Sequence, residues 1–234
     1  MFNHKKITLV QSKYEKFIEI SRRIEEAVKN IKPLDEDEKL FIFDVDHCLY
    51  HSLPLLEHEA RNAERWFLEK SSHTLQEFKN FVDMGIYWVE IFYLYAKQHP
   101  SWFLEKVDNF EFTEFIKERP ALVEAIKNIK HRKIIFSNAG KQRVLSILTI
   151  LGIQNEFEYI FVADSIDTDF MLKPKESSYE FVEKAMGIKE TRNIYFFDDN
   201  YKNINGAKLR GWNTYMVNDN IIEQIEKAHK DMNK

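Results

Sequence analysis

The stretch Phe41-Ile42-Phe43-Asp44-Val45-Asp46-His47-Cys48-Leu49-Tyr50 joins an apolar run to two acids, and the chain is best understood outward from it. The run up to Phe43 is aromatic and aliphatic, which is typical of a buried parallel strand. Acidic side chains do not belong inside such a strand, so Asp44 and Asp46 mark its carboxyl end. Ligands of open α/β sheets bind outside the carboxyl ends of the strands, and the two acids therefore lie where a site is expected.

The spacing of the two acids has a chemical use. Side chains alternate along an extended backbone, so Asp44 and Asp46 should emerge on the same side. Two carboxylates so close repel each other unless a cation joins them, and Mg²⁺ prefers oxygen ligands. Such a site suits phosphoryl transfer, in which one carboxylate attacks phosphorus and the other moves protons. Taken alone, however, the pair is more typical of an acidic turn in solvent.

Length and composition restrict the class of protein. A chain of 234 residues fits one domain, or a core domain with a smaller insertion. The formal charge of -4 and the pI near 6.1 lack the basic surplus of a nucleic-acid binder. Cys48 is the only cysteine, which points to a reducing compartment. With a polar start and no apolar window long enough to span a membrane, the sequence predicts a cytoplasmic protein with no nucleic-acid or membrane partner.

The first 38 residues predict a helical extension. Ser12-Lys13-Tyr14-Glu15 matches a capping box. The apolar residues that follow recur at helical spacing, namely Phe17, Ile20, Ile24, Ala27 and Ile31. We expect an amphipathic helix that packs on its own domain; a dimer contact through the same stripe is the second interpretation. The sequence does not determine the oligomeric state.

Residues 52–117 predict a helical insertion. Apolar residues recur there at helical spacing without a strand-like run, and Gly85 and Pro100 mark connections between about four short helices. Its many aromatic residues are expected to form a core rather than to stack on a substrate.

Residues 39–51 and 118–234 predict an α/β core. Strand-like runs alternate with helical patterns after Pro120; the runs are Lys133–Phe136, Tyr159–Val162, Asn193–Phe197 and Asn213–Val217. Such alternation indicates right-handed crossovers and a parallel sheet with helices on both faces.

Polar residues follow the strands of this core. Ser137-Asn138 comes after one strand and opens a helix, which predicts an anion site at the helix N-terminus. Lys173-Pro174 lies in the loop after the next strand, and Asp198-Asp199 follows a third. Each is ordinary alone: a turn, a surface lysine, an acidic loop. Together with Asp44 and Asp46, these three motifs place polar groups after four successive strands. Such a coincidence is expected by chance much less often than any one of the motifs alone.

These motifs resemble, in order, the four motifs of the haloacid dehalogenase-like phosphatases, over about residues 39–217. The resemblance implies a Rossmann-like three-layer core with residues 52–117 as the cap. A closer similarity is to the pyrimidine 5′-nucleotidase branch. It rests on four short strings: Asp46-His47-Cys48-Leu49-Tyr50, Phe136-Ser137-Asn138-Ala139, Leu151-Gly152-Ile153 and Phe197-Asp198-Asp199. His47 departs from that branch, which usually has Asn.

The resemblance also implies roles. Asp44 attacks phosphorus to give an aspartyl phosphate, and Asp46 acts as acid and then as base. The ligands of Mg²⁺ are Asp44, the main-chain carbonyl of Asp46, Asp198 and, directly or through water, Asp199. The groups that bind the phosphoryl oxygens are Ser137, Asn138 and Lys173. The expected substrate is a small phosphate ester, with UMP and CMP as first choices.

Other functions stay open at this point. Dehalogenation ranks low because a halide leaves unprotonated and needs no acid at Asp46. A sugar-phosphate mutase would keep the same core motifs. A catalytically silent module that binds phosphate or a partner is the alternative of another class. Cys48 is expected to pack beneath the acidic loop rather than to react.

Overall fold

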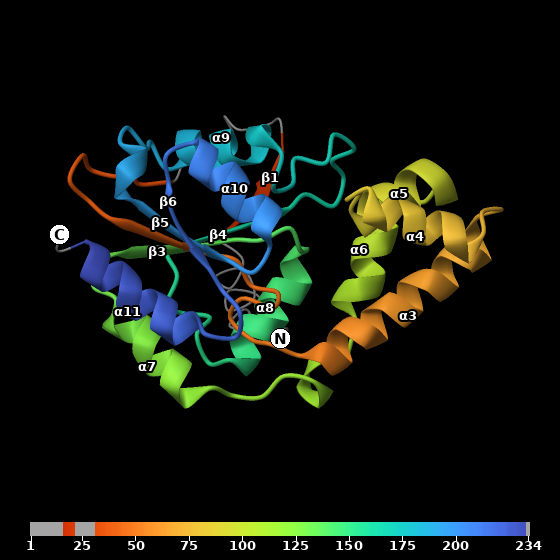
Figure 1. Ribbon diagram of the computed structural model, residues 1–234, viewed down its shortest axis with the longest axis horizontal. Coiled ribbons are helices and arrows are strands. Elements are labelled where there is room, and N and C mark those ends of the chain that lie inside the picture. The colour runs from red at the N-terminus through yellow and green to blue at the C-terminus, as the bar shows by residue number, and fades with distance from the viewer. Residues whose placement is uncertain (1–15, 22–30, 233–234) are drawn as a thin grey trace, which may run out of the picture.

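The computed structural model describes residues 16–21 and 31–232, which form a parallel six-stranded sheet with the order β1-β4-β3-β2-β5-β6. The strands are β1 (Phe17–Ile20), β2 (Leu40–Phe43), β3 (Arg132–Phe136), β4 (Tyr159–Ala163), β5 (Ile194–Asp198) and β6 (Asn213–Met216). β2 lies in the middle of the sheet, paired on one side with β3 and on the other with β5 (Figure 1). The strand that carries the two acids is therefore central.

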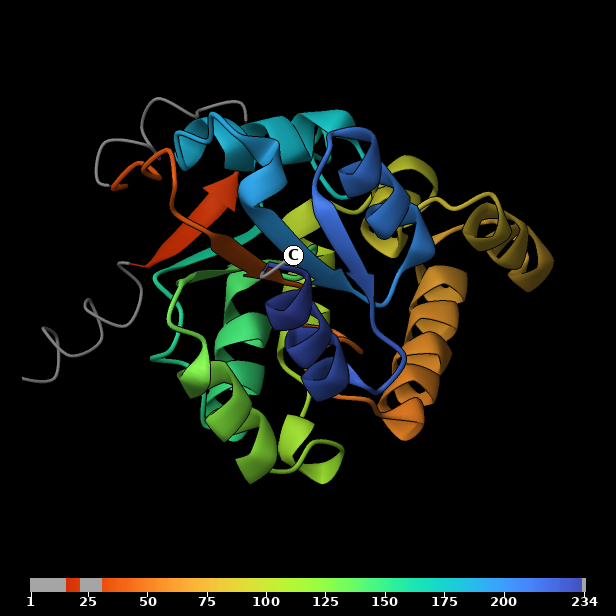
Figure 2. The ribbon, with the colours of Figure 1, turned by 60° about the vertical axis from the view of Figure 1, so that its left-hand side comes forward.

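Helices cover both faces of the sheet (Figures 1 and 2). One face carries α7 (Pro120–Asn128), α8 (Lys141–Ile150) and α11 (Ile221–Asp231). The other carries α9 (Glu176–Ala185) and α10 (Tyr201–Leu209), and the short helix η2 (Thr191–Asn193) leads into β5.

All four side chains of β2 are buried. Because side chains alternate along a strand, Phe41 and Phe43 join the core on one face and Leu40 and Ile42 the core on the other. The predicted three-layer α/β fold is confirmed.

A helical insert follows β2. It consists of α3 (Leu53–Lys70), α4 (Leu75–Asp83), α5 (Trp88–Ala96), α6 (Pro100–Asp108) and the short helix η1 (Phe112–Glu114). Helices α3 to α6 lie together beside the sheet and have their own apolar core, which includes Phe67, Phe92 and Phe103 (Figure 1). Phe112 of η1 belongs to the core of the sheet instead. The predicted insertion is confirmed, although α3 has 18 residues and is not short. None of the described helices has the length and hydropathy that crossing a membrane requires.

The helix expected near the N-terminus is wrong over residues 17–20. These residues form β1, which pairs in parallel with β4 from Phe17 opposite Ile160 to Ile20 opposite Ala163. Ile18 and Ile20 are buried and Glu19 is exposed, which is the alternation of an edge strand. Backbone pairing with the free edge of β4 outweighs an apolar spacing that also fits a helix. Ser12, Ile24 and Ala27, on which that expectation also rested, lie outside the described residues.

Candidate active site

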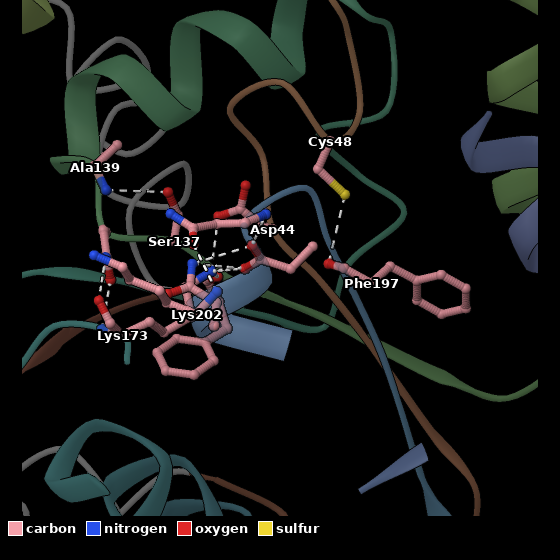
Figure 3. A network of polar contacts seen from close by, with 12 residues as sticks. Asp44, Cys48, Ser137, Ala139, Lys173, Phe197 and Lys202 are labelled. Carbon is pink, nitrogen blue, oxygen red and sulfur yellow. Dashed lines mark hydrogen bonds and ion pairs between the residues drawn. The ribbon is translucent and has the colours of Figure 1, made fainter. Parts of the chain in front are cut away.

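The carboxyl ends of three neighbouring strands bring distant motifs together. Asp44 directly follows β2, Ser137 directly follows β3, and Asp198 is the last residue of β5. The backbone N–H of Asp44 donates to the Phe197 carbonyl at 2.9 Å, which fixes the start of the acidic loop against β5. Lys173 reaches the same place from the loop between β4 and α9. Figure 3 shows Asp44, Ser137 and Lys173 lying close together.

Lys173 acts as a buried counter-ion. Its Nζ, which is inaccessible to solvent, donates to Asp44 Oδ1 at 2.8 Å and to Asp198 Oδ2 at 2.7 Å. A third bond goes to the Phe136 carbonyl at 2.6 Å, so each of the three ammonium hydrogens has a protein acceptor. Lys173 therefore joins the first and fourth motifs. Its expected contact with phosphoryl oxygens stays a prediction.

Three carboxylates form a group that could hold a cation. One oxygen each of Asp44, Asp198 and Asp199 lies within 4.8 Å of the others, and a set of carboxylate oxygens fits a hard ion such as Mg²⁺. Asp198 is held in place by α10, because Asn203 Nδ2 donates to its two oxygens at 3.0 and 3.1 Å. The backbone N–H of Asn200 adds a bond of 2.8 Å.

The pKa values of Asp44 and Asp199 reflect burial and repulsion between the carboxylates of this group. Burial raises the pKa of Asp44 well above its usual value, and the carboxylates of Asp198 and Asp199 raise it further against the attraction of Lys173. Burial and then Asp198 raise the pKa of Asp199 to about 7. Burial tends to lower the pKa of Lys173, but Asp198 and Asp44 outweigh it and raise that pKa above its ordinary value. One ammonium leaves the cluster with excess negative charge, which a divalent cation would relieve.

Asp46 lies beside this group but faces an arginine. Its Oδ1 accepts hydrogen bonds from Arg143 Nη2 at 2.6 Å, Arg143 Nε at 2.9 Å and the Tyr50 hydroxyl at 2.6 Å. Burial tends to raise the pKa of Asp46, but the charge and hydrogen bonds of Arg143 hold it below its usual value. Arg143, on α8, also forms an ion pair with Glu59 of α3. The arginine therefore links the second acid to the insert.

Ser137 and Asn138 differ in how they are used. The buried Ser137 accepts a hydrogen bond at Oγ from the Ala139 N–H at 3.1 Å. The Asn138 side chain makes two bonds of 2.8 Å with the main chain of Lys173, donating to its carbonyl and accepting from its N–H. Asn138 thus positions the lysine loop, and its expected contact with phosphate stays a prediction.

An acid of the insert lies at the N-terminus of α8, where the sequence predicts an anion. Asp108 Oδ2 is 2.7 Å from the position that a Cβ on Gly140 would take, so only glycine fits there without movement. Burial raises the pKa of Asp108 to about 6, although the charge of Arg143 and backbone N–H groups at the start of α8 lower it. The first turn of α8 therefore already faces a carboxyl group of the protein.

The loop after Asp46 explains two further residues. His47 has φ of 59°, which is a left-handed backbone conformation. Asn adopts this conformation more readily than most residues, and this is a physical reason why the pyrimidine 5′-nucleotidase branch usually has Asn at this position. Cys48 is buried and its Sγ lies 3.5 Å from the Phe197 carbonyl (Figure 3). The expectation that Cys48 packs beneath the acidic loop is confirmed.

A cavity of about 470 Å³ opens onto these groups. The sequence motifs contribute Asp44, Asp46, Ser137, Asn138 and Asp199 to its lining, and helices of the insert contribute further lining residues. The volume is typical of small-molecule sites, which measure about 300–1,000 Å³.

Sequence reasoning missed four polar residues that support the carboxylates: Tyr50, Glu59, Arg143 and Asn203. Arg143 and Glu59 are charged residues beside the apolar stripes of their helices, which is a weak signal for a buried ion pair. Asn203 lies in the first turn of α10, four residues after Asp199, and an inward-facing amide there could have been anticipated.

Comparison with known proteins places the chain in a family. The model of the haloacid dehalogenase-like hydrolases matches residues 38–211, and the chain belongs to this family. Among similar solved structures is the orthorhombic form of YfnB from Bacillus subtilis bound to magnesium, with 19% identity, a TM-score of 0.51, and alignment over 79% of this chain and 88% of that one.

Two further structures show the same fold. A HAD family enzyme from Bacteroides thetaiotaomicron has 14% identity and a TM-score of 0.54 over 78% of this chain and 95% of that one. A predicted phosphoglycolate phosphatase from Haemophilus somnus has 20% identity and a TM-score of 0.50 over 80% and 91%. At these identities the likeness concerns the fold, an α/β core with a helical insert.

Proposed function

We propose that this protein is a Mg²⁺-dependent phosphomonoester hydrolase that works through an aspartyl phosphate on Asp44. The observation that carries the proposal is that buried Lys173 donates hydrogen bonds to both Asp44 and Asp198, with the Asp199 carboxylate close to these two acids. Membership of a hydrolase family supports it. Residues 39–51 and 118–234 would form the catalytic core, and residues 52–117 the cap.

The residues fit a bound Mg²⁺, which would be held by Asp44, Asp198, Asp199 and the main-chain carbonyl of Asp46. When bound, it offsets the repulsion between the carboxylates and a phosphate dianion. Ser137 would orient a phosphoryl oxygen, and Lys173 would do so by exchanging one of its three protein acceptors for that oxygen. Asn138 holds the lysine loop and is available as a third contact. Such reactions depend chiefly on positioning and charge stabilisation.

In the first step Asp44 attacks phosphorus and the bond from phosphorus to the leaving oxygen breaks. Because Lys173 holds Oδ1 of Asp44, Oδ2 is the attacking atom. Asp46 gives its proton to the leaving oxygen. Arg143 and Tyr50 hold Oδ1 of Asp46, so Oδ2 carries that proton.

In the second step a water molecule attacks phosphorus, and the bond from phosphorus to Asp44 breaks. Asp46 takes the proton of the water, which restores the free Asp44 carboxylate and releases inorganic phosphate. The low pKa that Arg143 imposes on Asp46 favours the ionised form from which this second step starts, and the proton taken from water returns Asp46 to the acid form that the next cycle uses.

The first substrates to test are UMP and CMP, which the short strings around Asp46 and Ser137 favour. Phosphate release should be measured with Mg²⁺ on pyrimidine and purine nucleoside monophosphates and on hexose phosphates, with a chelator as control. We expect Mg²⁺-dependent release, fastest with UMP or CMP. Conversion of hexose 1-phosphates to isomers would favour a mutase. No turnover of any ester would favour a silent binding module and contradict the proposal.

A further inference from the structure

The cavity has two chemically different ends. The end formed by the sheet carries the carboxylates Asp44, Asp46 and Asp199 together with Ser137. The proposed function places the phosphoryl group there. The rest of the cavity must then take the leaving group, because it is continuous with this end.

The insert supplies an apolar wall to that second end. Its contributions come from each of its four main helices: Leu56, Val82, Val89, Phe103, Leu104 and Val107. Trp88 adds an aromatic surface. Of the described insert residues that line the cavity, Glu59 is the charged one, and it is paired with Arg143. The Tyr87 hydroxyl donates to Asn203 Oδ1 at 3.3 Å.

This wall offers little to a polar or anionic leaving group. Hydroxyl groups buried against aliphatic side chains lose their hydrogen bonds to water without gaining new ones. A second anion would lack a partner on the insert, and an unpaired buried charge is strongly disfavoured. Two cations of the core line the cavity. Arg143 is already paired with Asp46 and Glu59, whereas Lys202 of α10 lies beside Gly85 and is exposed to solvent.

We infer that the leaving group of the substrate is uncharged and ends in an aromatic or aliphatic surface. The inference rests on the proposed function, because it takes the carboxylate end as the phosphoryl end. A neutral nucleoside belongs to this class. A hexose, which is a polyol, and glycolate, which carries a second anion, do not.

The test compares primary alkyl phosphates, which share one type of leaving oxygen and so differ mainly in the body of the leaving group. The three esters are 2-phenylethyl phosphate, glucose 6-phosphate and 2-phosphoglycolate, each assayed with Mg²⁺. We expect kcat/KM for 2-phenylethyl phosphate to exceed the other two at least about tenfold, the scale on which apolar pockets discriminate. An equal or higher value for either polar ester overturns the inference.

A matched pair of variants tests the wall itself. Val82 lines the cavity and is 37% exposed, whereas Leu68 is 47% exposed and lies outside the lining. Val82→Lys should lower kcat/KM for 2-phenylethyl phosphate at least about tenfold and raise it for 2-phosphoglycolate. Leu68→Lys should leave both values unchanged. Equal effects of the two variants would contradict the inference, whereas a lack of turnover of all three esters by the unaltered protein would instead count against the proposed function.

Discussion

At the scale of single residues, Asp44 differs from its neighbours in its placement. It directly follows β2 and belongs to the group of three carboxylates with Asp198 and Asp199, whereas the Asp46 carboxylate is held by Arg143.

We expect Asp44→Asn to lower kcat at least about 1,000-fold, because an amide oxygen is a poor nucleophile. The fold should persist, since Asn keeps an acceptor for Lys173. Steady-state kinetics together with the thermal unfolding midpoint measure both effects. Appreciable turnover by this variant would rule out Asp44 as the nucleophile.

Asp199 should make magnesium affinity depend on pH. Its pKa of about 7 without metal lies above the usual value for an aspartate, so below pH 7 the ion must displace a proton. We expect the dissociation constant to be about tenfold larger at pH 6 than at pH 8, and to level off above pH 8. Calorimetric titrations in two buffers of different ionisation enthalpy would also detect the released proton. An affinity independent of pH, without proton release, would contradict this account.

Asp108 should lower stability at neutral pH. Its folded pKa of about 6 exceeds the usual value of 3.8, so the folded state holds the proton more tightly than the unfolded state. Stability contributed by this group is therefore present at low pH and is lost as the pH rises from about 4 to 6. Asp108→Asn should raise the free energy of unfolding by about 1–3 kcal/mol at pH 8 and by less at pH 5.

Urea unfolding at the two pH values measures this difference. Asp83→Asn, which alters an exposed acid of the same insert, is the control and should change stability little at either pH. An Asp108 variant that is less stable at pH 8 would show that the carboxylate is needed in its charged form at the start of α8.

At the scale of elements, the ion pair of Arg143 and Glu59 joins α8 of the core to α3 of the insert. Both side chains are nearly inaccessible to solvent, at 7% and 8%. Removing one partner leaves the other charge buried without compensation, which typically costs about 3–5 kcal/mol.

We expect Arg143→Met to lower the free energy of unfolding by about 3–5 kcal/mol. Adding Glu59→Leu should restore part of that loss, because the double variant removes one of the two carboxylates that the arginine leaves unpaired. Chemical denaturation of the single and double variants gives the comparison. A double variant less stable than Arg143→Met alone would show that Glu59 contributes through other contacts.

The elements also show what the sequence could and could not predict. The strand ends that carry Asp44, Ser137 and Asp198 were predictable, because parallel strands place their carboxyl ends at one edge of a sheet. β1 was not, since a four-residue apolar pattern fits a helix or a strand until a partner edge is known. The pairing of Arg143 with Asp46 and Glu59 depends on how α3 packs against α8, which local pattern does not encode.

At the scale of the whole molecule, the core and the insert share the site. The core supplies the charged groups at the strand ends, and the insert supplies the apolar wall of the cavity. Further contacts join the two parts beside the site: Lys175 pairs with Glu90 of α5 at 2.5 Å, and Tyr87 reaches Asn203, which in turn holds Asp198. The side chain of Asn203 thus connects Tyr87 of the insert to Asp198, a proposed metal ligand.

The central claim is that Asp44 carries the phosphoryl group during turnover. The most direct measurement is acid quenching of the protein during hydrolysis of a phosphate ester, followed by peptide mass spectrometry. The account predicts one phosphoryl group on Asp44 that appears with Mg²⁺ and is lost when a chelator is present. Turnover with no phosphoryl group on Asp44, or with the group on another residue, would contradict it.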